Sequence, residues 1–395
     1  MKTVIHLIHS HRAFDDRVFF KEAISLSKKY RTVILSETKD GFLHDMGGDI
    51  HEDGIYSNVE LYAIKDQTKY GLLDKVIRKI ARKLKFKKFE NYDALFEKID
   101  KLALHPDLIH IHEPGILGAT AHLKAKYGCK VIFDCHEYHY AYFQSEDVSS
   151  FTTLHVTAEK MVNLRRLLAP VDAVINVTRT MEAVNWFIFP WLLNETIYNS
   201  TLISKKIKTE KENPVVLVHE GTMSFIRGLK LMIALFDDDW FRDNVRLRIV
   251  GELKGKELEY FDESKIKNPL LEKCIEITGW VKYENLSEAI VGDIGIIFFE
   301  NTPNNYLGMP NKLFNYIGAG IPVLSVPLLE VGRMIESFDC GVVVERNVPA
   351  IKKGIMEIIE NYDRYSAGVE KAKEPMSWKA DEKKLYALYD ALFGE

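Results

Sequence analysis

Short apolar runs alternate with longer amphipathic stretches along most of this chain. Apolar runs of roughly four to eight residues between turn residues are typical of buried strands, and apolar residues spaced three or four apart are typical of helices. The regular alternation of the two patterns predicts an α/β protein, with helices on both faces of parallel sheets.

The pattern predicts two series of elements. The first contains a helix at Arg17–Lys29, capped by Asp15 or Asp16, and strands at Thr3–His9, Thr32–Ser36, Asp107–His112, Lys130–Asp134 and Ala173–Val177. The second contains helices at Phe225–Phe236 and Pro310–Gly320, and strands at Val215–His219, Arg246–Val250, Ile275–Gly279, Ile294–Phe299 and Ile321–Val326. The polar, lysine-rich stretch between the two series, Tyr198–Pro214, indicates an interdomain linker.

Composition is typical of two soluble domains. A chain of 395 residues is too long for one ordinary core, and 47% apolar with 28% charged residues is usual for globular proteins. The net charge of −4 argues against nucleic acid as a partner. The 4 cysteines lack CxxC spacing, the N-terminus does not resemble a signal peptide, and the apolar runs fall short of the roughly 20 residues that span a bilayer. We therefore expect a cytoplasmic protein.

The most distinctive segment runs from Asp293 to Val326, where a loop rich in Asn, Gly and Pro links a buried strand to a helix. Such a loop lies at the carboxyl end of a strand and leads into a helix N-terminus, where α/β folds bind anions. Lys312 falls in the first turn of the helix, where a cation opposes the helix dipole by roughly 0.3–1 kcal/mol unless an anion joins it. The segment therefore predicts a phosphate site.

A second anion site is predicted in the segment HEGTMSFIRGL. Gly221 falls in the turn after a strand, and Arg227 is expected in the first turn of the next helix. Taken alone, Arg227 is more simply a solvated surface residue. Together with Lys312, it suggests a diphosphate that is held by two cations without a metal ion.

Histidines end two strands of the first series. His110 and His112 share one face of a strand because strand side chains alternate, and His136 follows Asp134 at the end of another. Histidines with carboxylates can bind zinc, but the HExxH spacing is missing and no cysteine falls near enough to complete a ligand set. Hydrogen-bonded structural histidines are the commoner case. Both strand ends are still expected to face the cleft that contains the two cations.

A basic segment, Leu72–Phe89, carries 8 Lys or Arg residues in a chain that is acidic overall. Its apolar residues have helical spacing, so the predicted helix is amphipathic with a basic polar face. An ordinary surface helix is one interpretation. We favour a helix that lies on an anionic membrane, because the positive charge is so concentrated. The cations expected to face that membrane are Arg78, Lys79, Arg82 and Lys83.

Together these stretches resemble the retaining glycosyltransferases of family 4, whose two domains form the GT-B fold. The resemblance covers nearly the whole chain and rests on the order and spacing of HSHRAFDDRVFFKEAISL, HIHEPGILG, VIFDCHEYH, VINVTRTMEAV, HEGTMSFIRGL, IVGEL, ITGWVKYENL, PNKLFNYIGAGIPVLSV and SWKADEKKLYALY. It implies two Rossmann-like, doubly wound domains that face a cleft. The expected parts are an acceptor-binding domain at 1–195, a linker at 196–213, a donor-binding domain at 214–374, and a C-terminal helix at 375–395 that crosses back to the first domain.

The resemblance also implies roles for individual residues. Arg227 and Lys312 would hold the diphosphate and His136 would approach the donor sugar, so these three are the candidate catalytic residues. The other residues expected on the donor side are Gly221, Thr222, Gly279, Trp280, Val281, Gly308, Met309, Pro310, Asn311 and Asn315. Those expected on the acceptor side are Asp15, Asp16, Arg17, His112 and Glu113. No metal and no cofactor is expected, because the nucleotide-diphosphate sugar is a co-substrate.

Three positions depart from the pattern of that family. The stretch HSHRAFDDR stands where a Gly-rich loop is usual. Thr222 stands where many members carry a second diphosphate-binding Arg, and Asn315 stands where a Glu commonly binds the ribose hydroxyls. Because an amide can accept one such hydrogen bond but carries no charge, we expect Asn315 to bind the nucleotide more weakly than a Glu would.

The expected reaction moves a sugar from a nucleotide-diphosphate donor to a saccharide acceptor, lipid-linked, with retention at the anomeric carbon. Its setting would be cell-surface polysaccharide or glycolipid synthesis, with the protein peripheral on the inner face of the plasma membrane. Two alternatives remain open. One is a non-catalytic, glycosyltransferase-like binding subunit, suggested by Thr222 and Asn315. The other is a nucleotide-sugar 2-epimerase of the same fold, which would carry additional acid–base carboxylates in the cleft.

Overall fold

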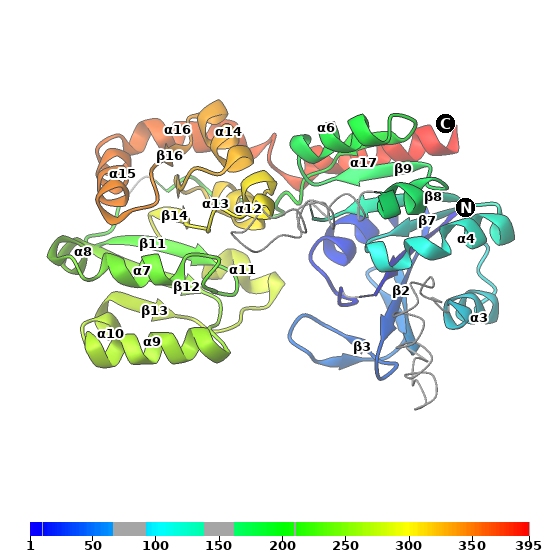
Figure 1. Ribbon diagram of the computed structural model, residues 1–395, viewed down its shortest axis with the longest axis horizontal. Helices are drawn as coiled ribbons and strands as arrows, with labels where there is room; N and C mark the ends of the chain where they lie inside the picture. Colours follow the sequence, from blue (N-terminus) through cyan, green and yellow to red (C-terminus); the bar gives the residue numbers. More distant parts are fainter. Residues whose placement is uncertain (10, 66–91, 138–161, 209–210, 395) are drawn as a thin grey trace.

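The chain forms two α/β domains that lie side by side, as the computed structural model in Figure 1 shows. The structure describes residues 1–9, 11–65, 92–137, 162–208 and 211–394. The basic segment Leu72–Phe89, with Arg78, Lys79, Arg82 and Lys83, lies outside the described residues. Within the described ranges, no helix is both long and apolar enough to cross a membrane.

The first domain is built on an eight-stranded sheet with the order β10-β9-β8-β7-β1-β2-β6-β5, parallel except between β5 and β6. Its strands are β1 (Thr3–Ile8), β2 (Arg31–Thr38), β5 (Gly54–Tyr56), β6 (Val59–Lys65), β7 (Leu108–Ile111), β8 (Lys130–Cys135), β9 (Ala173–Asn176) and β10 (Leu193–Thr196). The strand order reverses between β1 and β7, so their carboxyl ends open onto a crevice where such sheets bind ligands.

Helices and a separate hairpin complete the first domain. The helical elements are η1 (Val18–Ala23), α1 (Ile24–Leu26), α3 (Asp93–Lys101), η2 (Pro114–Ala119), α4 (Thr120–Tyr127) and α6 (Arg179–Ile188). The hairpin consists of β3 (Leu43–His44) and β4 (Ile50–His51).

The second domain is built on a six-stranded parallel sheet with the order β13-β12-β11-β14-β15-β16. Its strands are β11 (Val215–Glu220), β12 (Val245–Val250), β13 (Ile275–Ile277), β14 (Ile294–Ile297), β15 (Val323–Ser325) and β16 (Gly341–Val343). Its helices are α7 (Leu229–Leu235), α8 (Asp239–Asn244), α9 (Gly255–Lys267), α10 (Leu271–Cys274), α11 (Tyr283–Ala289), α12 (Pro303–Leu307), α13 (Asn311–Ala319), α14 (Leu329–Phe338), α15 (Val348–Glu360) and α16 (Tyr362–Lys373). The order reverses between β11 and β14.

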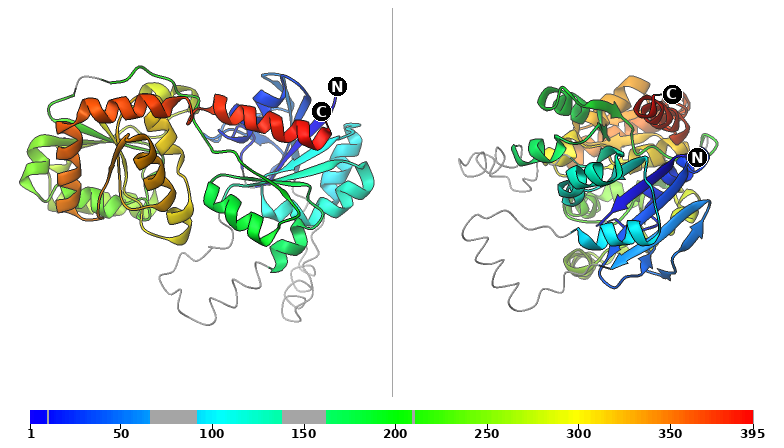
Figure 2. Two further views of the ribbon diagram at one scale, coloured as in Figure 1. Left: turned by 90° about the horizontal axis from the view of Figure 1, so that it is seen from above. Right: turned by 90° about the vertical axis from the view of Figure 1, so that its right-hand side faces the viewer.

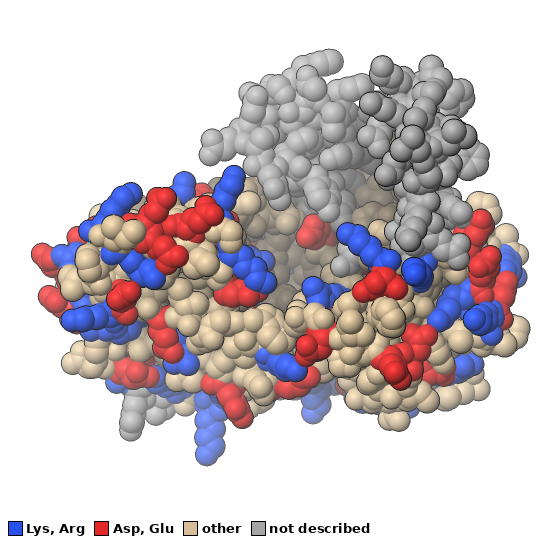
Figure 3. Space-filling view, turned by 90° about the horizontal axis from the view of Figure 1, so that it is seen from below, with Lys and Arg blue, Asp and Glu red and all other residues tan. Residues whose placement is uncertain are grey.

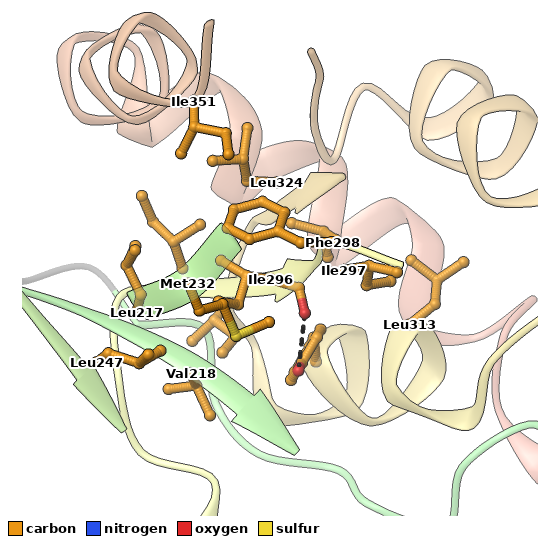
Figure 4. Close-up of a cluster of buried hydrophobic side chains, with 14 of the residues drawn as sticks. Leu217, Val218, Met232, Leu247, Ile296, Ile297, Phe298, Leu313, Leu324 and Ile351 are labelled. Carbon is orange, nitrogen blue, oxygen red and sulfur yellow. Dashed lines mark hydrogen bonds between the residues drawn. The ribbon is translucent and has the colours of Figure 1, made fainter. Parts of the chain in front are cut away.

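Helices lie on both faces of the second sheet, and its central strands are apolar over Val215–Val218 of β11 and along the whole of β14. Leu217 of β11 and Ile296 of β14 are fully buried. Figure 4 shows the side chains of these strands meeting Met232 of α7, Leu313 of α13 and Ile351 of α15. This core fixes the carboxyl ends of β11 and β14 relative to the start of α13.

The last helix, α17 (Trp378–Phe393), returns to the first domain, as the resemblance implied (Figures 1 and 2). Leu385 belongs to the same buried cluster as Val4 of β1. The Trp378 indole donates a hydrogen bond to the Ser25 hydroxyl over 2.9 Å. On the face that Figure 3 draws, acidic and basic side chains are interspersed over both domains, in keeping with the net charge of −4.

The predicted strands all form, and each of their ends lies within two residues of the predicted one. Strands β5, β6, β10 and β16 and the β3–β4 hairpin were not predicted. The helix predicted at Phe225–Phe236 begins only at Leu229, because Gly228, with φ of 97°, interrupts the backbone before it. Neither Asp15 nor Asp16 is the N-cap residue of η1, which is Arg17, but Asp15 Oδ1 accepts hydrogen bonds from the backbone N–H groups of Arg17 and Val18.

Candidate active site between the two domains

A cleft of about 780 Å³ lies between the domains, beside the carboxyl ends of β8 and β11 and the start of α13. The first domain contributes His136, Glu137, Val177 and Met181. The second contributes Glu220, Gly221, Thr222, Ser224, Ile226, Arg227, Phe299, Asn304, Asn305, Gly308, Met309, Pro310, Asn311 and Lys312. The structure thus brings all three candidate catalytic residues and six of the expected donor-side residues into one space.

Lys312 lies in the first turn of α13, as predicted, but its side chain is buried rather than solvated. Its ammonium donates a hydrogen bond to the backbone carbonyl of Glu220 over 2.5 Å. Burial, together with the charge of Arg227, outweighs the attraction of Glu220 and lowers the pKa of Lys312 to about 8. A buried cation at a helix N-terminus is favoured by a bound anion, because the anion neutralises the charge and meets the helix dipole.

Arg227 does not lie in a first helical turn, which corrects the prediction. It precedes Gly228, the N-terminal cap of α7, and its guanidinium donates to the backbone carbonyl of Thr222 over 2.5 Å. Burial lowers its pKa. A Cβ added at Gly221 would lie 3.3 Å from the Lys312 ammonium and 4.0 Å from an Arg227 nitrogen, so both cations border one small space that glycine leaves open.

Asn315 does not face the cleft but lies behind it, with 7% of its surface exposed. Its side-chain amide donates a hydrogen bond to the Glu220 carboxylate over 3.3 Å. Glu220 ends β11 and lines the cleft. A carboxylate therefore does lie beside Asn315, but it belongs to Glu220 at the end of β11.

His136 lines the cleft just after the end of β8, and residues of the first domain bind its Nε2. Its Nε2 lies 3.0 Å from the Asp134 carboxylate and 3.2 Å from Nδ1 of His112. Arg17 binds the same carboxylate through two nitrogens, at 2.7 and 3.0 Å. The ring nitrogen Nδ1 of His136 remains for a ligand, so the arrangement fixes which edge of the imidazole can act.

Four of the residues expected on the acceptor side are buried, so their contact with an acceptor stays a prediction. Arg17 is 2% exposed and His112 is 1% exposed, and both belong to the network around Asp134. Asp15 and Glu113 are 6% exposed. The Glu113 carboxylate accepts hydrogen bonds from the backbone N–H groups of residues 9 and 11, and Asp15 pairs with His11. These hydrogen bonds hold the loop after β1 in place.

His11 remains near the cleft from this loop, with its ring 4.7 Å from that of His136. Burial alone would lower the pKa of His11, but the hydrogen bond and charge of Asp15, aided by Glu113, raise it to about 9. The pairing in turn lowers the pKa of Asp15. At neutral pH the loop therefore carries an imidazolium beside His136.

Asp16 takes part in a bridge between the domains. Its carboxylate accepts a hydrogen bond from Asn311 over 3.1 Å, and the Asn311 amide oxygen accepts another from Asn199 over 2.8 Å. Lys21 donates to Asn199 over 2.5 Å. Asn311 thus ties the start of α13 to the first domain and fixes one wall of the cleft.

Trp280 lies against the β3–β4 hairpin of the first domain, because a Cβ at Gly47 would come within 2.9 Å of its ring. Next to it, the Lys282 ammonium lies 3.6 Å from the Asp49 carboxylate. Gly279, Trp280 and Val281 do not line the 780 Å³ cleft, so the expected contact of this loop with a base stays a prediction.

Two groups of described side chains have ligand atoms close enough together for a metal ion: His6, Glu22, His110 and His112 in one, and His112, Asp134 and His136 in the other. The Arg17 guanidinium lies 3.0 Å from Glu22 and 2.7 Å from Asp134. A metal cation in either group would meet this fixed positive charge at short range, so the donor sets fit a cation poorly.

Residues 201–375 match the family model of glycosyl transferases group 1. The match covers the second sheet, both cations and the start of α13. The matched residues run from the end of the linker through α16, so the likeness to this family lies in the second domain. No curated protein is significantly similar to the chain in sequence.

Solved structures of glycosyltransferases share the fold over the full chain. Sucrose-phosphate synthase from Thermosynechococcus elongatus is 14% identical, with a TM-score of 0.70 and 100% of each chain covered. HepE from Anabaena, in complex with UDP, is 14% identical, with a TM-score of 0.65 and 99% of this chain and 100% of that chain covered. A TarM mutant from S. aureus, in complex with fondaparinux, alpha-GlcNAc-glycerol and UDP, is 12% identical, with a TM-score of 0.69 and 100% of each chain covered. The chain therefore has the GT-B fold, which confirms the predicted fold class.

Several residues that line the cleft were not predicted, and Glu220 is the most important of them. Glu220 could have been predicted, because it ends a strand directly before Gly221, and ligands bind at the carboxyl ends of such strands. Asn304 and Asn305 lie on α12, a short helix that the sequence pattern placed in a loop. Ser224, Ile226 and Phe299 also line the cleft, but their residue types carry no chemical signal.

Proposed function

We propose that the protein transfers a sugar from a nucleotide-diphosphate donor to a hydroxyl of a saccharide acceptor, with retention at the anomeric carbon and without a metal ion. The single observation that carries the proposal is the pair of cations, Lys312 and Arg227, beside the open space at Gly221 and the N-terminus of α13. The similar HepE structures contain UDP or UDP-glucose, which makes a uridine nucleotide the first donor to test.

The chemistry follows from the charges in the cleft. As the bond between the anomeric carbon and the diphosphate oxygen breaks, negative charge develops on the diphosphate. Lys312, Arg227 and the backbone N–H groups at the start of α13 stabilise that charge without a metal. The acceptor oxygen bonds to the anomeric carbon on the same face, and its proton passes to the departing diphosphate oxygen.

His136 acts from the opposite domain on the donor sugar. Because Asp134 and His112 engage its Nε2, the other ring nitrogen is presented to a hydroxyl of the sugar. The residue positions the sugar between the two domains, and its contribution depends on the cleft being closed.

Glu220 accepts hydrogen bonds from hydroxyls of the donor. Its carboxylate is held by the Asn315 amide and faces the space next to Lys312. A carboxylate can accept from two adjacent hydroxyls at once, which a neutral amide at the same place cannot do equally well. Glu220 thus compensates for the amide at Asn315.

We further propose a lipid-linked saccharide as the acceptor, with the protein at the inner face of the plasma membrane and a role in cell-surface polysaccharide or glycolipid synthesis. Support comes from the concentrated charge of the basic segment Leu72–Phe89. The TarM structure contains saccharides together with UDP, which supports a saccharide acceptor in general.

A nucleotide-sugar 2-epimerase remains the second candidate, because Glu137 and Glu220 both line the cleft and could serve as acid and base. The test is incubation of the protein with UDP-sugars in excess EDTA, with and without saccharide acceptors. Transfer predicts a glycosylated product only when the acceptor is present. An epimerised sugar without acceptor would favour the second candidate, and UDP binding with neither product would favour a binding subunit.

A further inference from the structure

Helix α6 carries its largest apolar side chains on the solvent side. Trp186 is 63% exposed and Phe187 is 82% exposed. The opposite side of the helix is buried through Met181 and Asn185, and Asn185 donates to Asn176 of β9 over 2.5 Å. A surface helix of a globular protein normally places polar residues on its outer face. The outer face of α6 is therefore a candidate binding surface.

Two more large apolar side chains are exposed shortly after the helix in the chain. Trp191 is 47% exposed and Leu193 is 43% exposed, and both follow α6 directly in the chain. We call Trp186, Phe187, Trp191 and Leu193 the aromatic patch. Its adjacent groove of about 470 Å³ is lined by Arg179, Thr180, Ala183, Val184, Phe187, Ile188 and Arg333. Large exposed rings in a contiguous patch are typical of a docking surface.

Arginines border the aromatic patch. The Arg165 guanidinium lies 5.1 Å from the centre of the Trp191 ring, and both Arg165 and its neighbour Arg166 are exposed. Arg179 begins α6 and is also exposed. We call Arg165, Arg166 and Arg179 the arginine rim. Tryptophan rings with arginines beside them are the combination found where proteins meet the headgroup region of a bilayer.

Two carboxylates close to the groove, Glu182 and Glu330, are engaged elsewhere, whereas Glu336 of α14 is exposed. Glu182 of α6 accepts a hydrogen bond from the Thr196 hydroxyl. Glu330 of α14, whose side chain is 4% exposed, accepts from the backbone and hydroxyl of Thr180, and its other neighbour is Arg333 at 3.7 Å. The surface therefore presents rings and positive charge, which is complementary to an anionic lipid headgroup layer.

The patch lies next to the catalytic cleft. Val177 and Met181 line the cleft, whereas Arg179 and Ala183 line the groove, so the first turn of α6 separates the two. Figures 1 and 2 show α6 on the outer surface of the first domain. A lipid surface that contacts the patch would lie within reach of an acceptor whose saccharide enters the cleft.

We propose that the aromatic patch and the arginine rim dock onto an anionic lipid bilayer, with Trp186, Phe187 and Trp191 in the headgroup region. The proposal rests on the proposed function only in that a lipid-linked acceptor would be met there; the docking itself needs no reaction. It differs from the membrane role predicted for Leu72–Phe89, because it assigns the contact to α6 and the residues around it.

The test is co-sedimentation of the full chain with vesicles of phosphatidylglycerol and phosphatidylcholine, against vesicles of phosphatidylcholine alone. The wild type is expected to bind the anionic vesicles and to lose most of that binding between low salt and 0.5 M salt. Replacing Phe187 and Trp191 by Ser, or Arg165 and Arg166 by Glu, should lower the affinity at least tenfold. The matched control replaces Ile266, 81% exposed on α9 of the second domain, by Ser and Lys267 by Glu, and should bind as the wild type.

A second measurement locates the contact. Vesicles that contain brominated lipid should quench the tryptophan fluorescence of the wild type and of a Trp280→Phe variant. The quenching should largely disappear in a Trp186→Phe/Trp191→Phe variant that still sediments with vesicles. Melting temperature and UDP binding, measured on every variant, separate a failure of docking from a failure of the fold or of the proposed function.

Three results would overturn the proposal. The patch variants would bind anionic vesicles as the wild type does. Alternatively, replacement of Arg78, Lys79, Arg82 and Lys83 by Glu would abolish binding while the patch variants retain it. Finally, light scattering would reveal a dimer that the patch variants dissociate, which would assign the patch to a second copy of the chain.

Discussion

The Asn315 amide donates its hydrogen bond to the Glu220 carboxylate, 95 residues earlier in the chain. The pair joins the second turn of α13 to the end of β11, directly beside Lys312. An amide at this place is thus no sign of a lost binding site. It supports a carboxylate that the neighbouring strand supplies.

Replacing Glu220 by Gln should weaken UDP binding by tenfold or more, because a hydrogen bond to a charged acceptor is worth roughly 1.5–3 kcal/mol. Replacing Asn315 by Glu should also weaken it, since two carboxylates would then share one site. Isothermal titration with UDP measures both. The control is Glu259→Gln, an exposed position on α9. Tighter binding by Asn315→Glu would mean that the amide faces the ligand itself.

Donor binding should weaken as the pH rises above about 8. The pKa of Lys312 is lowered to about 8 in the free protein, so the ammonium loses its proton above that pH. A bound diphosphate favours the charged form, so binding must take up a proton there, and the Kd should rise about tenfold per pH unit. Titrations with UDP between pH 7 and 10 measure this dependence.

The Lys312→Arg variant tests the assignment, because a guanidinium keeps its charge throughout this range. Its Kd should be nearly independent of pH. His11, whose pKa is raised to about 9, also titrates in this range, and a His11→Gln variant should keep the wild-type profile. A flat profile in the wild type would contradict the account of Lys312.

The His11–Asp15 pair should stabilise the fold below about pH 9. The pKa of His11 is raised from 6.5 to about 9 by Asp15, so the stabilisation is complete below pH 6.5 and is lost as the pH rises through 9. The shift in pKa sets the upper limit of this stabilisation, and solvent reduces it because the His11 side chain is 28% exposed. We therefore expect on the order of 2 kcal/mol. Urea unfolding of the wild type and of His11→Gln from pH 6 to 10 measures it.

The matched control for this prediction is His44→Gln. His44 pairs with Asp40 at the same spacing of four residues, but Asp40 is 48% exposed, so the pair should contribute little. If the wild type and His11→Gln differ by the same free energy at pH 6 and at pH 10, the coupling of His11 to Asp15 is wrong.

Replacing His136 by Ala should lower turnover at least a hundredfold while changing UDP affinity less than threefold. The residue comes from the first domain and contacts the sugar in the closed cleft, whereas the nucleotide is held by the second domain. Initial rates and UDP titration together separate the two effects. His122→Ala, at an exposed position on α4, is the control. Unchanged turnover would leave His136 with a structural role beside Asp134.

The sequence predicts the fold and one side of the cleft well because those signals are local. Pro310 and Gly320 mark the ends of α13 by their backbone preferences, and Lys312 follows from counting within the first turn. The strands were recognisable because both faces of the central ones are buried and the apolar runs are continuous. The start of α7 was misplaced because Gly228 adopts a positive φ, which is one of several conformations open to glycine.

The surroundings of the residues expected on the acceptor side could not be predicted from the sequence, because they depend on which elements cover each strand face. Alternation places His110 and His112 on one face, but α17 closes over that face, and His110 lies 2.9 Å from the Tyr389 hydroxyl. Likewise Arg17 reaches Asp134 across 117 positions of the chain. Glu220 and Asn315 meet only when β11 and α13 are packed together. These contacts are set by tertiary packing rather than by any local pattern.

The central claim is that Arg227 and Lys312 hold a nucleotide diphosphate in place of a metal. The most direct measurement is isothermal titration of UDP in 5 mM EDTA to the wild type, to an Arg227→Met/Lys312→Met variant and to a Lys230→Met control, which changes an exposed cation of α7. The account predicts binding by the wild type and the control, and at least a hundredfold loss in the double variant at an unchanged melting temperature. Equal binding by all three proteins, or binding by the wild type only after Mg²⁺ is added, would contradict it.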